Sequence, residues 1–237
     1  MKPNDIVRDT HTDNRINISW RNAYHQAGHA AAIYLVNKQK LLPKVPFQIV
    51  IKPQESTKQL TDWYAGLYNK YIAKVEGGRL LQHLPASHTE ATQALSWYEE
   101  AELRCAFEAD VINLLAGPLA EAKYLSMRDG EPFNANLVNL SALRYYGGSP
   151  DIELANDYLE GFIPKVTERK QKLEELFLAA FNFVNERPVW LKITGLADFI
   201  WVQPIGTIPC GELAPILGEG MTETPKRQLV AEHLVTG

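Results

Sequence analysis

The sequence predicts a mainly α-helical domain with a small β-sheet near its N-terminal third. Apolar residues recur at helical spacing through several long segments, whereas the alternation typical of a strand is clear only over residues 45–52. The 237 residues are enough for one domain with a substantial core. We expect a flexible arm over residues 1–18 and one domain over residues 19–237.

The composition narrows the classes of partner and location. Twenty-four basic residues stand against 28 acidic ones, and no basic cluster is present, which argues against nucleic acid or an anionic membrane surface as a partner. No apolar run approaches the roughly 20 residues that cross a bilayer, and the polar N-terminus lacks the apolar core of a signal peptide. We therefore predict a soluble, cytoplasmic protein with no membrane span.

The N-terminal part is expected to contain one helix and two strands. Ser19 is a suitable N-cap for a helix that ends near Asn37. The strand over residues 45–52 carries Pro46 near its start, which indicates an edge strand or the first residues of a strand. An edge strand beside the helix could receive an extended peptide through main-chain hydrogen bonds, although the strand could also be purely structural. A second strand is predicted within residues 63–75.

The rest of the chain is expected to be helical. A long helix should begin near Glu90 and end at Asp129, and Pro118 should kink or restart it. Ser149 is a suitable N-cap for a helix with Pro150 in its first turn. The shorter helices are predicted at residues 137–145, 149–161, 165–186, 188–201 and 212–217.

The first helix contains a pattern typical of zinc binding. His25 and His29 are four residues apart, so their side chains share one face of the helix and can bind one Zn²⁺, as in the H-E-x-x-H helix of zinc peptidases. The same spacing also occurs by chance. In that motif the glutamate after the first histidine is the general base, and here its position holds Gln26. The amide oxygen of Gln26 can accept a hydrogen bond from a zinc-bound water but cannot take its proton.

A zinc peptidase site needs a third protein ligand. Asp151 at the start of a predicted helix is the strongest candidate, although an aspartate in a first turn is also favoured by the helix dipole alone. The other histidines lie in predicted loops or tails and are interpreted as surface residues: His11, His83, His88 and His233.

Three stretches resemble, in order, motifs of the FtsH-type family, the membrane-anchored AAA+ zinc metalloproteases. Residues 24–31 are similar to its H-E-A-G-H-A zinc helix, and residues 114–122 to its L-x-G-R-A-A-E-E helix. Residues 147–155 resemble its G-A-x-N-D-L-x-x-A-T segment, whose aspartate is the third zinc ligand, and a later stretch over residues 185–197 also matches. The resemblance implies a helical zinc-peptidase-like domain with a peptide or protein substrate, possible homo-oligomers, and zinc held by His25, His29 and Asp151.

The departures from this family bear on catalysis. Gln26 replaces the general base, Pro118 replaces an arginine, Pro150 replaces an asparagine, and no G-x-x-x-x-G-K-[ST] motif of an ATPase module is present. Glu121 could replace the missing base or could support a zinc-bound histidine. We therefore expect a zinc metallopeptidase-type domain with weak or no activity, or a non-catalytic pseudoprotease that binds peptides or proteins. A glutamine at position 26 is compatible with natural loss of activity and with an engineered substitution.

Overall fold

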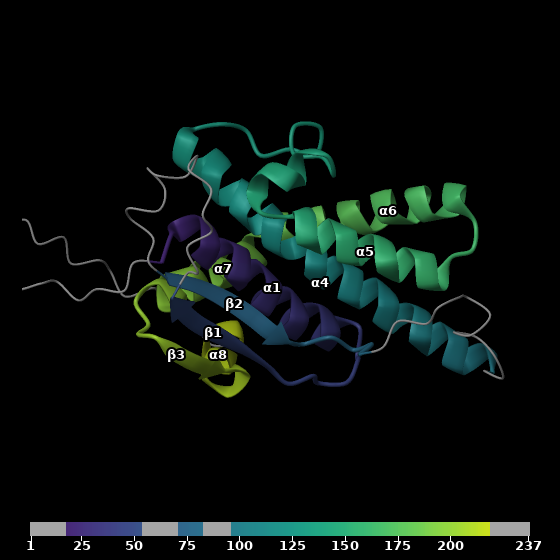
Figure 1. Cartoon of the computed structure of the whole chain (residues 1–237), viewed down its shortest axis with the longest axis horizontal. Coiled ribbons are helices and arrows are strands. Elements are labelled where there is room, and N and C mark those ends of the chain that lie inside the picture. The colour runs from purple at the N-terminus through teal and green to yellow at the C-terminus, as the bar shows by residue number, and fades with distance from the viewer. Residues whose placement is uncertain (1–17, 54–70, 83–95, 219–237) are drawn as a thin grey trace, which may run out of the picture.

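The computed structural model describes residues 18–53, 71–82 and 96–218 (Figure 1). It confirms a mainly helical fold with one small sheet. The predicted arm lies outside the described residues except for Ile18, which is buried and forms a β-bridge with Tyr71, so Ile18 belongs to the fold. The helices are α1 (Trp20–Gln39), α4 (Trp97–Asp129), the 3₁₀ helix η2 (Ala142–Tyr146), α5 (Ser149–Phe162), α6 (Val166–Asn185), α7 (Arg187–Trp201) and α8 (Cys210–Leu217).

The sheet is antiparallel with the order β2-β1-β3, where β1 is Phe47–Pro53, β2 is Tyr71–Gly77 and β3 is Gly206–Pro209. Of the two predictions made from Pro46, an edge strand is wrong, because β1 is central, and a position at the start of a strand is confirmed. Pro46 lies just before β1, where its missing N–H is not needed, and its carbonyl accepts from the Gly78 N–H at 3.0 Å. No pattern in the sequence predicted β3, which has only four residues.

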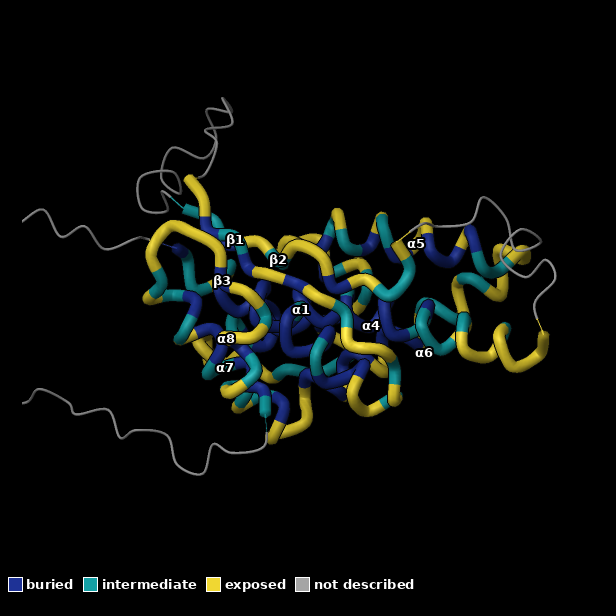
Figure 2. Tube along the Cα trace, turned by 90° about the horizontal axis from the view of Figure 1, so that it is seen from below, coloured by how far each residue is buried: buried dark blue, intermediate teal, exposed yellow. Residues whose placement is uncertain are grey.

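Helix α1 lies at the centre of the described part of the chain (Figure 1). It packs against α4, α7 and β2, and the buried parts of the trace gather around α1 and α4 (Figure 2). Gly28 allows α4 to approach closely, since a Cβ there would lie 2.5 Å from the Ala116 carbonyl oxygen and 2.7 Å from the Ala120 Cβ. The missing side chain of Gly28 thus lets the backbone of α4 lie close to α1.

Helix α4 begins at Trp97 and not near Glu90. Ser96 and Glu99 form a capping box, in which the serine hydroxyl accepts from the Glu99 N–H and the glutamate accepts from the Ser96 N–H at 2.8 Å. Pro118 stands inside this one continuous helix, so the predicted restart does not occur. Gly130 ends the helix in a left-handed conformation with φ of 71°.

Two predicted helix starts differ from the structure. The helix expected over residues 137–145 is reduced to η2, which is closed by Gly147 with φ of 70°. Ser149 is the first residue of α5 and not its cap, because Gly148 takes the N-cap position. The predicted helices at residues 165–186, 188–201 and 212–217 agree with α6, α7 and α8 to within two residues. None of the described helices is both long and apolar enough to cross a membrane.

Candidate metal centre

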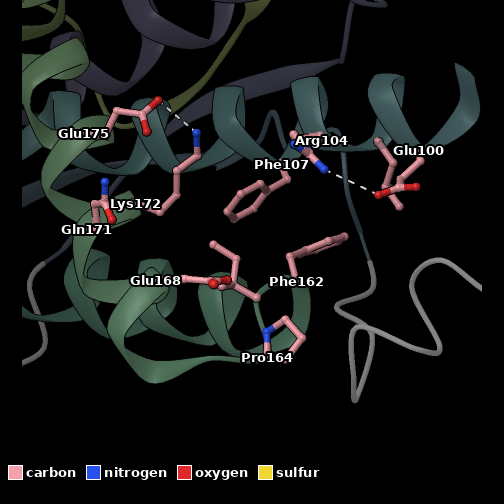
Figure 3. A pocket seen from close by; sticks show the side chains of 11 residues that line it. Glu100, Arg104, Phe107, Phe162, Pro164, Glu168, Gln171, Lys172 and Glu175 are labelled. Carbon is pink, nitrogen blue, oxygen red and sulfur yellow. Dashed lines mark hydrogen bonds and ion pairs between the residues drawn. The ribbon is translucent and has the colours of Figure 1, made fainter. Parts of the chain in front are cut away.

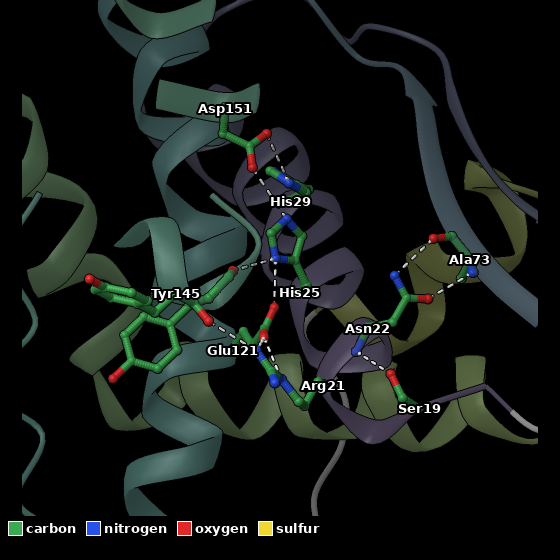
Figure 4. Close-up of polar contacts among 10 residues, drawn as sticks. Ser19, Arg21, Asn22, His25, His29, Ala73, Glu121, Tyr145 and Asp151 are labelled. Carbon is green, nitrogen blue, oxygen red and sulfur yellow. Dashed lines mark hydrogen bonds and ion pairs between the residues drawn. The ribbon is translucent and has the colours of Figure 1, made fainter. Parts of the chain in front are cut away.

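The first helix and the start of α5 bring the three predicted ligands together (Figure 4). His25 Nε2 lies 3.3 Å from Asp151 Oδ2, and His29 Nε2 lies 3.5 Å from Asp151 Oδ1. One ligand atom from each residue lies within 4.8 Å of the others. Ligands that surround a tetrahedral ion at about 2.0–2.1 Å are roughly 3.4 Å apart, so the group fits a small divalent cation.

The ring of His25 is fixed by groups on its far side. Its Nδ1 lies 3.0 Å from Glu121 Oε2 and 3.2 Å from the Tyr146 carbonyl oxygen, and both are acceptors. Nδ1 therefore carries a hydrogen, which leaves Nε2 for the side that faces Asp151. Glu121 is held in turn by Arg21, whose Nε donates to Oε1 at 2.8 Å, and whose Nη2 donates to the Tyr145 carbonyl at 3.0 Å (Figure 4).

The ring of His29 is fixed by α4. Its Nδ1 donates to the Asn113 carbonyl oxygen at 2.9 Å, so its Nε2 also faces Asp151. Gly117 makes room for this ring, because a Cβ at that position would overlap His29 Nε2 and lie 2.7 Å from Cδ2. The A-G-P-L-A-E stretch of α4 thus provides both the space for His29 and, through Glu121, the support for His25.

The electrostatics of the three groups favour a cation. Burial lowers the pKa of His25, but its bonds to Asp151 and Glu121 outweigh this and raise the pKa to about 9. Burial lowers the pKa of His29, and the charge of His25 acts in the same direction. Burial raises the pKa of Asp151, but the two imidazoles more than offset it and keep the pKa below its usual value. At neutral pH and without a metal, His25 therefore carries a second proton on Nε2 and lies as a cation between Glu121 and Asp151; a metal ion at this site would replace that proton.

Gln26 is committed to the neighbouring strand. Its Oε1 accepts from the Val75 N–H at 2.7 Å, which uses one of the two acceptor positions of this oxygen and fixes the direction of the amide. One helical turn earlier, Asn22 pairs with Ala73, accepting from its N–H at 2.7 Å and donating to its carbonyl at 3.1 Å. Two amide side chains of α1 thus hold the free edge of β2.

The metal-binding group opens into a cleft of about 620 Å³ between α1, β2, α4 and the start of α5. His25, His29, Asp151 and Gln26 all line this cleft, whereas Glu121 does not. A second hollow of about 330 Å³ lies between α4, α5 and α6, with Phe107 in its wall (Figure 3). None of the three candidate ligands lines it.

Comparisons with protein-family models, curated proteins and solved structures found no match. The likeness to FtsH-type peptidases therefore depends on the sequence motifs.

The structure adds supporting residues that the sequence analysis did not single out. Arg21 and Asn22 each lie four residues before His25 and Gln26, so the helical spacing that revealed the histidine pair could also have revealed them. The Asn113 carbonyl had no such signal, because a main-chain acceptor has no residue preference. The remaining histidines, His11, His83, His88 and His233, lie outside the described residues.

Proposed function

We propose that this chain is an FtsH-like, zinc-metallopeptidase-type domain that binds one Zn²⁺ through His25, His29 and Asp151. The convergence of these three side chains carries the proposal. Nitrogen and carboxylate ligands in a group of three are typical of catalytic zinc sites, which leave one position open. A bound zinc ion would act as a Lewis acid that polarises a carbonyl group and makes water more acidic.

The chain's own residues favour binding over hydrolysis. Gln26 cannot take a proton, and loss of a positioned general base typically costs about 10²–10⁴ in rate. Glu121 lies behind His25 in an ion pair with Arg21, with Oε1 2.7 Å from Nη2, which suits a residue that orients His25 and not one that receives a proton from the cleft. We expect weak or no peptidase activity.

The second candidate is a non-catalytic module that binds a peptide or protein. The hydrogen bond between Gln26 Oε1 and the Val75 N–H favours it, because it gives the glutamine a structural role that needs no chemistry. Homo-oligomers are compatible with either candidate.

A paired assay of the wild type and Gln26→Glu tests the two candidates. A carboxylate can keep the bond to Val75 with one oxygen and offer the other to the cleft. Turnover of a quenched fluorescent peptide that rises by about 10²-fold or more in Gln26→Glu, and is lost with a chelator, would support a peptidase-type site without its base. No turnover in either protein, with zinc bound to both, would favour the binding module.

A further inference from the structure

We propose that the cleft receives the free C-terminus of a polypeptide, whose terminal carboxylate is bound by Gln26 Nε2 and by the cations Lys74 and Arg79. The inference rests on the proposed metal-binding cleft and specifies its ligand. It differs from an endopeptidase site, in which the polypeptide continues past the metal in both directions.

The outer edge of β2, which faces away from β1, is occupied over most of its length. The Ala73 N–H and carbonyl are bonded to Asn22, the Val75 N–H is bonded to Gln26, and Tyr71 is bridged by Ile18. These are the main-chain groups that an added strand would need. In an antiparallel ladder, every second residue of β2 points its N–H and C=O groups away from β1. On this outer edge, the next groups that an added strand could use are the Val75 carbonyl and the main-chain groups of Gly77.

The direction of the strand decides which end of a polypeptide fits. The pairs β1–β2 and β1–β3 are both antiparallel, which is the more stable kind of pairing, and the parallel contact at this edge is a single isolated bridge between Ile18 and Tyr71. A peptide that pairs with β2 in this manner enters at Gly77 and runs toward Val75. Its last residue then stops at Gln26, where the edge is closed, so the end that reaches the metal-binding group is the C-terminus.

Gln26 presents a donor at this point. Because its Oε1 is tied to the Val75 N–H, Nε2 is the polar atom that the side chain can offer to the cleft. Among the residues that the structure describes, Nε2 has no acceptor. An amide N–H is complementary to a carboxylate oxygen, whereas a glutamate at this position would repel it.

The charges of the cleft also favour a ligand that carries a carboxylate. Lys74 and Arg79 are exposed and line the cleft. Lys74 forms no ion pair with any other described residue, whereas Arg79 also interacts with the Asp110 carboxylate and the Tyr158 hydroxyl. Of the cleft's acids, Asp110 is bound by two main-chain N–H groups and a tyrosine hydroxyl, Glu76 accepts from a glutamine of β1, and Asp151 belongs to the metal-binding group. With a divalent ion bound, the cleft carries net positive charge and favours an anionic ligand.

The test compares peptides that differ only at their C-terminus. A fluorescein-labelled decapeptide ending in leucine, chosen because Ile33, Leu114 and Leu154 give the cleft an apolar wall, is made as the free acid and as the amide. Binding to zinc-loaded protein is followed by fluorescence anisotropy. We expect the acid to bind at least about tenfold more tightly, as for a charge-assisted hydrogen bond.

Variants assign the carboxylate contacts. Lys74→Gln combined with Arg79→Gln should remove most of the preference for the acid, whereas Lys170→Gln on the exposed face of α6 should not. Gln26→Glu keeps an acceptor for Val75 and should abolish or reverse the preference. Retention of the full preference in both cleft variants would overturn the proposed contacts.

Zinc content, measured on the same samples by elemental analysis, separates this inference from the proposed function. Equal binding of acid and amide to protein with one zinc per chain overturns the inference and leaves the metal site standing. A preference for the acid without any bound zinc supports the inference and overturns the metal function. If acetate displaces the labelled peptide as strongly as the unlabelled peptide does, the ligand is a small carboxylate. This result would overturn the proposal that the cleft binds the C-terminus of a polypeptide.

Discussion

Replacing Gly117 by alanine should separate metal binding from folding. The added Cβ would overlap His29 Nε2 and lie 2.7 Å from Cδ2, whereas carbon atoms in contact need about 3.5 Å. The ring must therefore move by about 0.8 Å or more, while metal sites tolerate about 0.2 Å. The helix gains about 1 kcal/mol from alanine and loses about 1–3 kcal/mol to overpacking, so the net destabilisation is about 0–2 kcal/mol, which a domain of this size tolerates without unfolding.

Zinc affinity of Gly117→Ala, measured by competition with a chromogenic chelator, should fall by at least about 100-fold, the upper end of what loss of a supporting partner costs. Circular dichroism and urea unfolding of the metal-free protein should show a fold close to the wild type. Gly195→Ala is the matched control, because Gly195 also lies inside a helix, α7, and its added Cβ would make only an ordinary contact, 3.4 Å from Ile216 Cγ2. Wild-type zinc affinity in a folded Gly117→Ala would refute the placement of His29.

Three further substitutions test the supports of the fold and the site. Glu121→Gln removes the charged acceptor of His25 and should weaken zinc binding by about 10- to 100-fold; an unchanged affinity in the chelator assay would limit Glu121 to a structural role. Burial lowers the pKa of Lys123 from 10.5 to about 8. Between pH 8 and 10.5 the lysine is therefore protonated in the unfolded chain but not in the folded one, so the free energy of unfolding should rise with pH over this range. Lys123→Met should flatten this rise, measured by urea unfolding at pH 8 and 9.5. Ser96→Ala breaks the capping box of α4 and should cost about 1 kcal/mol in the same assay, while a change near zero would show that the first turn contributes nothing.

Much of the fold and the candidate ligands could be predicted from local patterns. Periodicity identified α1, α6 and α7, and the i, i+4 spacing of His25 and His29 required no tertiary information. Asp151 could be named because a helix start and a family motif coincide at that position. That Asp151 meets the two histidines, which lie more than 120 residues before it in the sequence, came only from the structure.

The predictions that failed depend on context outside the local sequence. Strand position within a sheet is set by pairing, so Pro46 could not reveal that β1 lies between β2 and the unpredicted β3. Pro118 remains inside α4 because the packed helix tolerates one lost donor. The role of Gln26 was also beyond sequence reasoning, since its oxygen is committed to Val75, a residue 49 positions away.

The most direct test of the central claim is the zinc content of protein that has been loaded with zinc and then gel-filtered. We predict one zinc per chain for the wild type and for Glu153→Ala, which removes an exposed carboxylate from α5 near Asp151. We predict less than about 0.2 zinc per chain for Asp151→Ala and for His29→Ala, because a tetrahedral site with two protein ligands binds weakly. A wild type below that level, or an Asp151→Ala variant that keeps one zinc per chain, would contradict the assignment of the metal centre.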